Sequence, residues 1–179
     1  MNDIVSEDIK RLSRGPNILA MRFKGFLING YRFRIKDRDG GKKTQNSGVM
    51  VIASTPSFSS SKDQNPVVGN VHYYGVVKDI IELDYSGHLK VVLFKCEWFD
   101  FKEDEFKLPF VNFRKLIYQN DPYVLASQVQ QVFYVQDPRD SNWHNAVKVT
   151  PKDSYNVGEE SFPDDGGKFA KELNNVTIL

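Results

Sequence analysis

Six basic residues between positions 32 and 43 are the side chains whose type and spacing best suit a binding function. Arg32, Arg34 and Lys36 alternate along a strand-like segment, which places them on one face of that strand. Such a row of cations suits the phosphates of a nucleic-acid duplex, because the release of counterions then supplies binding free energy. The candidate DNA-binding set comprises Arg32, Arg34, Lys36, Arg38, Lys42 and Lys43.

The segment that follows this strand carries two further polar side chains, Gln45 and Asn46, which can contact sugar or base edges. The formal net charge of the chain is only +1, so a nucleic acid would have to be met by this local patch. The alternative for the whole set is a solvated face of an edge hairpin, since Lys and Arg protect strand edges from aggregation.

Aromatic residues in the strand-like segments offer a second kind of site. A cage of aromatic rings can hold a methylated lysine, because the ring faces attract the cation. The candidate aromatic pocket comprises Tyr73, Tyr74, Trp98 and Trp143. The alternative is core packing, which aromatic side chains in strands usually serve.

Catalytic or metal-binding chemistry has weaker support. A thiolate nucleophile needs a nearby base, and no pattern typical of a catalytic cysteine surrounds Cys96, the one thiol of the chain. We expect Cys96 to be a small buried hydrophobe instead. A structural zinc site needs about four ligands at close spacing, whereas His72, His88 and His144 are widely scattered.

Acidic residues near the ends of the central strands could serve a metal-dependent nuclease if they projected into one pocket. These residues are Asp79, Glu82, Asp84, Glu97 and Asp100. Acids at strand ends and in turns are mostly solvated turn formers. We therefore expect no enzyme, no metal and no cofactor, and a nuclease is the third hypothesis.

The elements that must position these residues centre on the stretch from Val71 to Asp100. Two apolar, β-branched runs flank the segment DYSGH, and Gly87 within it is expected to adopt a left-handed conformation in a hairpin loop. In the second run one face carries Val92, Phe94, Cys96 and Trp98, while the other begins with Leu89, Val91 and Leu93 and then turns polar. In the first run, strict alternation places Tyr73, Val77, Ile81 and Leu83 on one face.

A second hairpin is predicted upstream, because Asn29-Gly30 between strand-like runs is a strong signal for a two-residue turn. Phe26 then opposes Phe33, and one face forms a core side of Phe26, Ile28, Tyr31, Phe33 and Ile35. About seven short strands with little helix favour a mainly β domain, a small barrel or a sandwich with short helical turns.

The expected organisation has an N-terminal arm with a short helix at 1–15, a β-rich domain at 16–151 and a flexible polar tail at 152–179. The sequence contains no apolar run of about 20 residues, so we expect no membrane span and no membrane partner. With one cysteine, no intrachain disulfide can form, and together with an N-terminus unlike a signal peptide this favours an intracellular protein.

Four blocks of sequence resemble one family in the same order along the chain. They are YRFRIKDRDG with the nearby TQNSGV, NPVVGNVHYYGVVKDIIELDY, VVLFKCEWFD, and DPYVLASQVQQVFYVQDP followed by WHNAVKV. Together they resemble the uncharacterised domain that follows the transposase region in plant En/Spm (CACTA) transposon proteins. The resemblance covers roughly 15–151.

This resemblance implies a plant, nuclear, transposon-derived protein and a non-catalytic domain accessory to DNA transposition. It implies DNA, nucleosomes or the transposase itself as partners and supplies no chemistry, because the catalytic acids of such transposases lie in a separate domain. A looser likeness of order and spacing links Ile80–Glu82, Trp98-Phe99 and 121–135 to bromo-adjacent homology domains of chromatin proteins. It favours the alternative of a peptide or modified-histone reader, although likeness of fold does not establish function.

Overall fold

The computed structural model describes residues 6–42, 44–57, 67–87, 89–117, 120, 122–151 and 176–177, which form a mainly β protein. None of the helices in these ranges has the length and apolar character needed to cross a bilayer. In chain order the elements are α1 (Glu7–Ser13), β1 (Leu19–Phe23), β2 (Gly25–Ile28), β3 (Tyr31–Arg34), η1 (Lys36–Arg38), β4 (Gly48–Ser57), β5 (Val67–Tyr85), β6 (Leu89–Glu103), β7 (Pro109–Ile117), β8 (Tyr123–Leu125), η2 (Ala126–Gln128), β9 (Gln130–Gln136), β10 (Trp143–Lys148) and β11 (Val176–Thr177).

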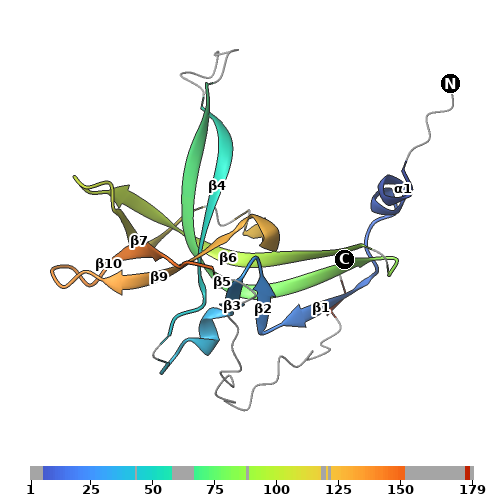
Figure 1. Ribbon diagram of the computed structural model, residues 1–179, viewed down its shortest axis with the longest axis horizontal. Coiled ribbons are helices and arrows are strands. Elements are labelled where there is room, and N and C mark those ends of the chain that lie inside the picture. The colour runs from blue at the N-terminus through green and yellow to red at the C-terminus, as the bar shows by residue number, and fades with distance from the viewer. Residues whose placement is uncertain are drawn as a thin grey trace.

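The main sheet closes on itself. Its pairings run in a ring from β5 to β4, β9, β10, β7, β6 and back to β5, and every pair is antiparallel. Figure 1 shows β7, β9 and β10 gathered on one side of the molecule, with β5 and β6 running away from them. Of the two architectures that the sequence left open, a barrel is therefore the one that forms.

Side chains inside this ring form the barrel core, which consists of Met50, Tyr74, Val76, Phe99, Val111, Val132, Tyr134 and Ala146. A second cluster lies on the other face of β5 and β6, and we call it the outer core. It consists of Phe33, Val49, Val77, Ile80, Phe94, Cys96, Trp98, Ala126 and Val129. The same two strands therefore contribute one face to each core, as the alternation of side chains along a strand allows.

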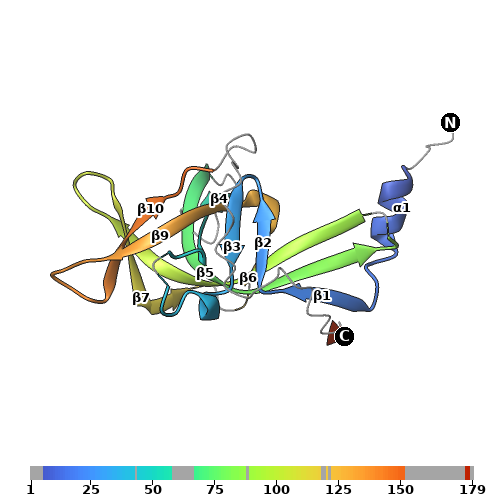
Figure 2. The same ribbon diagram turned by 60° about the horizontal axis from the view of Figure 1, so that its bottom comes forward.

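The β2–β3 hairpin covers the outer core, and Figure 2 shows it crossing in front of β5 and β6. The predicted turn and register are confirmed, because Asn29 and Gly30 both have positive φ and Phe26 pairs with Phe33. The expected core side also packs as predicted. Phe23, at the end of the separate strand β1, also packs on the outer core.

The predicted face of β5 is wrong beyond Val77, because a bulge interrupts the alternation there. Val77 pairs with Cys96 and Asp79 pairs with Lys95, so Lys78 is an extra residue. Ile80 and Glu82 therefore share a face with Val77, and Ile81 and Leu83 point the other way. The predicted apolar face of β6 is confirmed, since Phe94, Cys96 and Trp98 all lie in the outer core.

Strands β4 and β5 extend beyond the barrel into a polar part of the sequence. β4 continues to Ser57, and β5 already begins at Val67. In Figure 1 these ends of β4 and β5 project upward from the barrel as a two-stranded ribbon. Pro56 is tolerated because β4 pairs with β9 only at Val49 and Met50, which leaves the outer part of β4 at an edge.

After β7 the chain forms the short strand β8 and then the short helix η2. The N-terminal arm contains the expected helix, which ends before Gly15. Within the predicted tail, the structure describes only β11, which pairs antiparallel with β1 at Leu19 and Ala20.

Candidate functional site

The outer face of the β2–β3 hairpin carries the two arginines at the centre of the predicted DNA-binding set. Phe33 is buried in the outer core, and its neighbours Arg32 and Arg34 project from the opposite face of β3. Across the hairpin they face Leu27 and Gly25. Leu27 is exposed, so the arginine row lies beside an accessible apolar side chain.

The remaining cations of the set follow directly after this strand. Lys36 and Arg38 are in η1 and not on the strand face where alternation had placed Lys36, because the strand ends at Arg34. Lys42 is exposed in the loop that follows, and Lys43 lies outside the described residues. The described part of the predicted set therefore forms a continuous stretch of chain over β3, η1 and the loop after η1. We call this stretch, Arg32–Lys42, the basic segment.

A buried carboxylate fixes the return of the chain from the basic segment into the barrel. Asp39 is almost completely buried, and its two carboxylate oxygens accept the backbone N–H groups of Asn46 and Ser47 at 3.0 and 3.2 Å. The Asn46 carbonyl accepts the N–H of Arg34 at 2.9 Å, and the Ser47 carbonyl accepts that of Val77 at 2.8 Å. The loop is thus tied both to β3 and to β5.

Two glutamines attach the basic segment to β9. Gln131 is buried, and its Nε2 donates to the carbonyl oxygens of Arg32 and Asn46. The side chain of Gln45 makes two hydrogen bonds to the backbone of Tyr134. Its Nε2 donates to the Tyr134 carbonyl oxygen, and its Oε1 accepts the Tyr134 N–H, each at 3.0 Å. Gln45, predicted to contact nucleic acid, therefore has its amide engaged within the protein. Gln131 was missed because its only signal is a single polar residue on an otherwise apolar face of the strand.

Within the basic segment the cations outnumber the two acids, Asp37 and Asp39. Lys36 lies near His144 of β10, and burial lowers the pKa of this histidine, with a smaller contribution in the same direction from the Lys36 charge. The exposed carboxylate of Asp37 lies 4.0 Å from the ammonium group of Lys78, which is also 3.7 Å from Glu97. The buried Asp39 is engaged with backbone N–H groups as described, so Asp37 is the acid of this segment that faces solvent.

The four residues of the predicted aromatic pocket lie in different environments. Tyr73 and Trp98 come together beside the outer core, with ring centroids 6.5 Å apart. Tyr74 is on the opposite face of β5, where its ring packs against Phe101 in the barrel at 5.0 Å. Trp143 of β10 is partly exposed, and the Lys102 ammonium group lies over its ring, 4.2 Å from the ring centroid. Tyr73 and Tyr74 therefore cannot line one cage.

The groups considered for catalysis are also separated. Cys96 is buried in the outer core, where burial strongly raises the pKa of its thiol. His88 lies outside the described residues, and among the described ones no three His, Cys, Asp or Glu side chains gather as a metal site would require.

Each of the five acids has a separate local partner. Asp79, Glu82, Glu97 and Asp100 pair with Arg22, Lys90, Lys78 and Lys115, respectively, and Asp84 accepts the N–H of Gly87 in the hairpin loop. Glu82 is buried, and the five acids are held by separate partners and do not share one pocket in this structure.

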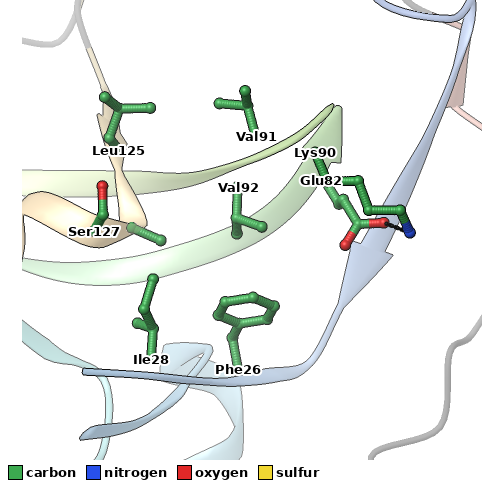
Figure 3. A pocket seen from close by; sticks show the side chains of 9 residues that line it. Phe26, Ile28, Glu82, Lys90, Val91, Val92, Leu125 and Ser127 are labelled. Carbon is green, nitrogen blue, oxygen red and sulfur yellow. Dashed lines mark hydrogen bonds and ion pairs between the residues drawn. The ribbon is translucent and has the colours of Figure 1, made fainter. Parts of the chain in front are cut away.

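A cavity that sequence reasoning missed lies on the other side of the β2–β3 hairpin. It has a volume of about 410 Å³ and opens to solvent between β2, β6 and η2. Its lining residues are Phe26, Ile28, Glu82, Lys90, Val91, Val92, Leu125, Ala126 and Ser127. Figure 3 shows apolar side chains on most of its wall and the ion pair between Lys90 and Glu82 at one end.

The fold and these surfaces define an all-β barrel domain with a basic outer hairpin and a separate apolar cavity. A family model described as "Domain of unknown function (DUF4216)" matches residues 81–146, from the middle of β5 to β10. Comparison with curated proteins finds no significant match. Comparison with solved structures finds none either.

Proposed function

We propose that this protein is a non-catalytic accessory domain that binds DNA through the basic segment, whose two arginines project from the outer face of the β2–β3 hairpin. The observation that carries the proposal is the way this segment is held. Arg32 and Arg34 project from a hairpin whose inner face is packed into the outer core. Binding residues are commonly presented by such rigid scaffolds, because little order is then lost on association.

The expected mode of binding is contact with phosphates. Arginine presents a planar set of donors that matches phosphate oxygens, and lysine adds a point charge. The amide of Gln45 is engaged with β9, so the segment offers few groups for reading base edges. We therefore expect binding with little sequence preference, and an affinity that falls steeply with salt.

The resemblance to the domain of CACTA transposon proteins supports a transposon-derived protein that acts in the plant nucleus. In that setting the DNA would be free duplex or nucleosomal DNA, close to the transposase. A histone reader built on the four aromatic residues has less support, because Tyr73 and Tyr74 face different cores.

The test is fluorescence anisotropy of a labelled random-sequence duplex titrated with the protein at two salt concentrations. We expect the dissociation constant to rise at least about tenfold between 50 and 200 mM salt if several phosphates are contacted. The double variant Arg32→Glu/Arg34→Glu should lose most of the binding. Lys107→Glu/Lys148→Glu, which changes two exposed lysines elsewhere and produces the same change in net charge, should retain it.

Equal loss of binding in both double variants would show a response to net charge alone and would contradict the proposed surface. If the wild-type protein does not bind even at 50 mM salt, DNA binding is refuted. Nucleosomes and the transposase domain would then be tested as partners by pull-down.

A further inference from the structure

Strand β6 has a stretch of edge without a strand partner in the described part of the chain. On the side away from β5, β8 pairs with it only at Leu93, Phe94 and Lys95. The chain then leaves the sheet to form η2, so no described strand pairs with this edge from Leu89 to Val92. Cys96 donates its N–H to Pro122 on the β8 side, and alternation directs the backbone groups of Val92 and Lys90 to that side as well.

The cavity lies directly beside this unpaired edge. Val92 belongs to its wall, together with Phe26 and Ile28 from the inner face of the hairpin. Leu125, Ala126 and Ser127 line it where β8 turns into η2. The hydrogen bond from Asn29 Nδ2 to the Ser127 carbonyl, at 3.2 Å, ties the tip of the hairpin to η2 and holds these walls together.

A largely buried carboxylate marks one end of the cavity. The side chain of Glu82 is 11% exposed, and Lys90, which is 48% exposed, donates to its Oε1 at 2.9 Å. The other carboxylate oxygen has no hydrogen bond from a described residue and points away from this ammonium group in Figure 3. The contact with Glu82 raises the pKa of Lys90, so this ammonium group remains charged near neutral pH.

We propose that this edge and cavity bind an extended segment of a partner protein in which basic and apolar residues alternate. The segment would pair antiparallel with β6 over Leu89–Val92. The apolar part of one lysine or arginine side chain would lie along Phe26 and Val92. Its cation would reach the carboxylate oxygen of Glu82 that does not accept the hydrogen bond from Lys90. Lys90, already half exposed, would remain at the mouth of the cavity.

The alternation follows from the opposite face of the same sheet. Val91 and Leu125, which border the cavity at the strand edge, share this face with Leu93. Val91 and Leu93 are only partly buried and Leu125 is exposed, so apolar side chains of the added strand would find apolar neighbours. Neighbouring residues of the added strand point to opposite faces, and the segment therefore reads basic, apolar, basic. This site and the basic segment lie on opposite faces of the β2–β3 hairpin, so it is a second site, independent of DNA binding.

The experiment measures anisotropy of a fluorescein-labelled peptide of alternating valine and lysine, titrated with the full chain. We expect Glu82→Gln to weaken binding at least about tenfold, because a largely buried charged partner is lost. Lys90→Met should tighten binding, since Glu82 then has no internal cation to compete with the peptide. Lys95→Met, which removes an exposed lysine of the same strand outside the cavity, should have no effect.

Two peptides N-methylated on alternate residues, in the two possible registers, test the main-chain pairing. The peptide whose methyl groups replace the N–H groups that face β6 should lose binding. An alternating valine–glutamate peptide should not bind. The proposal is overturned if the first peptide fails to bind at about 1 mM, if both N-methylated registers bind as well as the parent, or if Glu82→Gln has no effect. Should Glu82→Gln fail to fold, Lys90→Met and the methylated peptides test the same contacts, and an unchanged affinity in both would overturn it equally.

Discussion

Replacing Gln131 with leucine should destabilise the protein by about 3 kcal/mol. The side chain is 4% exposed, and its Nε2 is the donor to the Arg32 carbonyl on the outer edge of β3. Leucine has a similar volume but no donor. The Asn46 carbonyl would retain the N–H of Arg34, whereas the Arg32 carbonyl would lose the hydrogen bond from Gln131.

The magnitude follows from two contributions. Loss of the hydrogen bond to the Asn46 carbonyl, which keeps another donor, costs about 1 kcal/mol, and leaving the Arg32 carbonyl without the Gln131 donor costs about 1–3 kcal/mol, which together give about 2–4 kcal/mol. For a domain of this size, about 3 kcal/mol corresponds to a Tm lower by about 6–12 °C.

Urea unfolding followed by tryptophan fluorescence measures this free energy, and Gln130→Leu is the matched control. Gln130 is the preceding residue of β9, is exposed, and undergoes the same chemical change. We expect the control to alter the free energy of unfolding by no more than about 0.5 kcal/mol. If the two variants lose the same stability, the hydrogen bond from Gln131 does not anchor the hairpin and the reasoning fails.

Two further predictions concern β5 and β10. Gly75→Ala should lower the free energy of unfolding by about 1–3 kcal/mol, since its Cβ would lie 2.5 Å from the Glu97 carbonyl oxygen and 2.7 Å from the Trp98 ring, whereas Gly69→Ala in the same strand meets no atom within 4 Å and should be nearly neutral. Burial lowers the pKa of His144 below 6.5, so the unfolded chain binds more protons just below that pH and stability should fall as the pH drops through this range. Denaturation curves at pH 7 and 5 measure this fall in the free energy of unfolding, which should be smaller in His144→Gln than in the wild-type protein. An identical pH dependence in both proteins would refute the role of His144.

Local signals in the sequence were sufficient to predict the hairpins and the class of fold. Asn29-Gly30 determines its turn because both residues adopt positive φ, and Gly87 does so in the central loop. The alternation of Phe94, Cys96 and Trp98 predicts the buried face of β6 because no bulge interrupts it between these residues. These features depend on residues that are close together in the chain.

The remaining features depend on contacts between distant segments, which periodicity does not encode. The bulge at Lys78 shifts the phase of β5 by one residue, and no glycine or proline marks it. The alternating arginines were enough to identify the basic set in the sequence. Its attachment to β9 was not predictable, because the hydrogen bond from Gln131 to Arg32 joins residues 99 positions apart. The cavity likewise combines walls from β2, β6 and η2, which come together only after the outer core has formed.

The closed ring of strands determines how much of the chain is needed for the domain to fold on its own. The matched segment 81–146 begins beyond the bulge in β5 and contains no part of β4. Without β4, strand β9 has nothing to join it to β5, and Met50, Tyr74 and Val76 are missing from the barrel core. A genetic rearrangement that copied only that segment would yield an open sheet with unprotected edges, which tends to aggregate. The smallest heritable module must therefore reach back at least to β4, and to β2 if the outer core is to be covered.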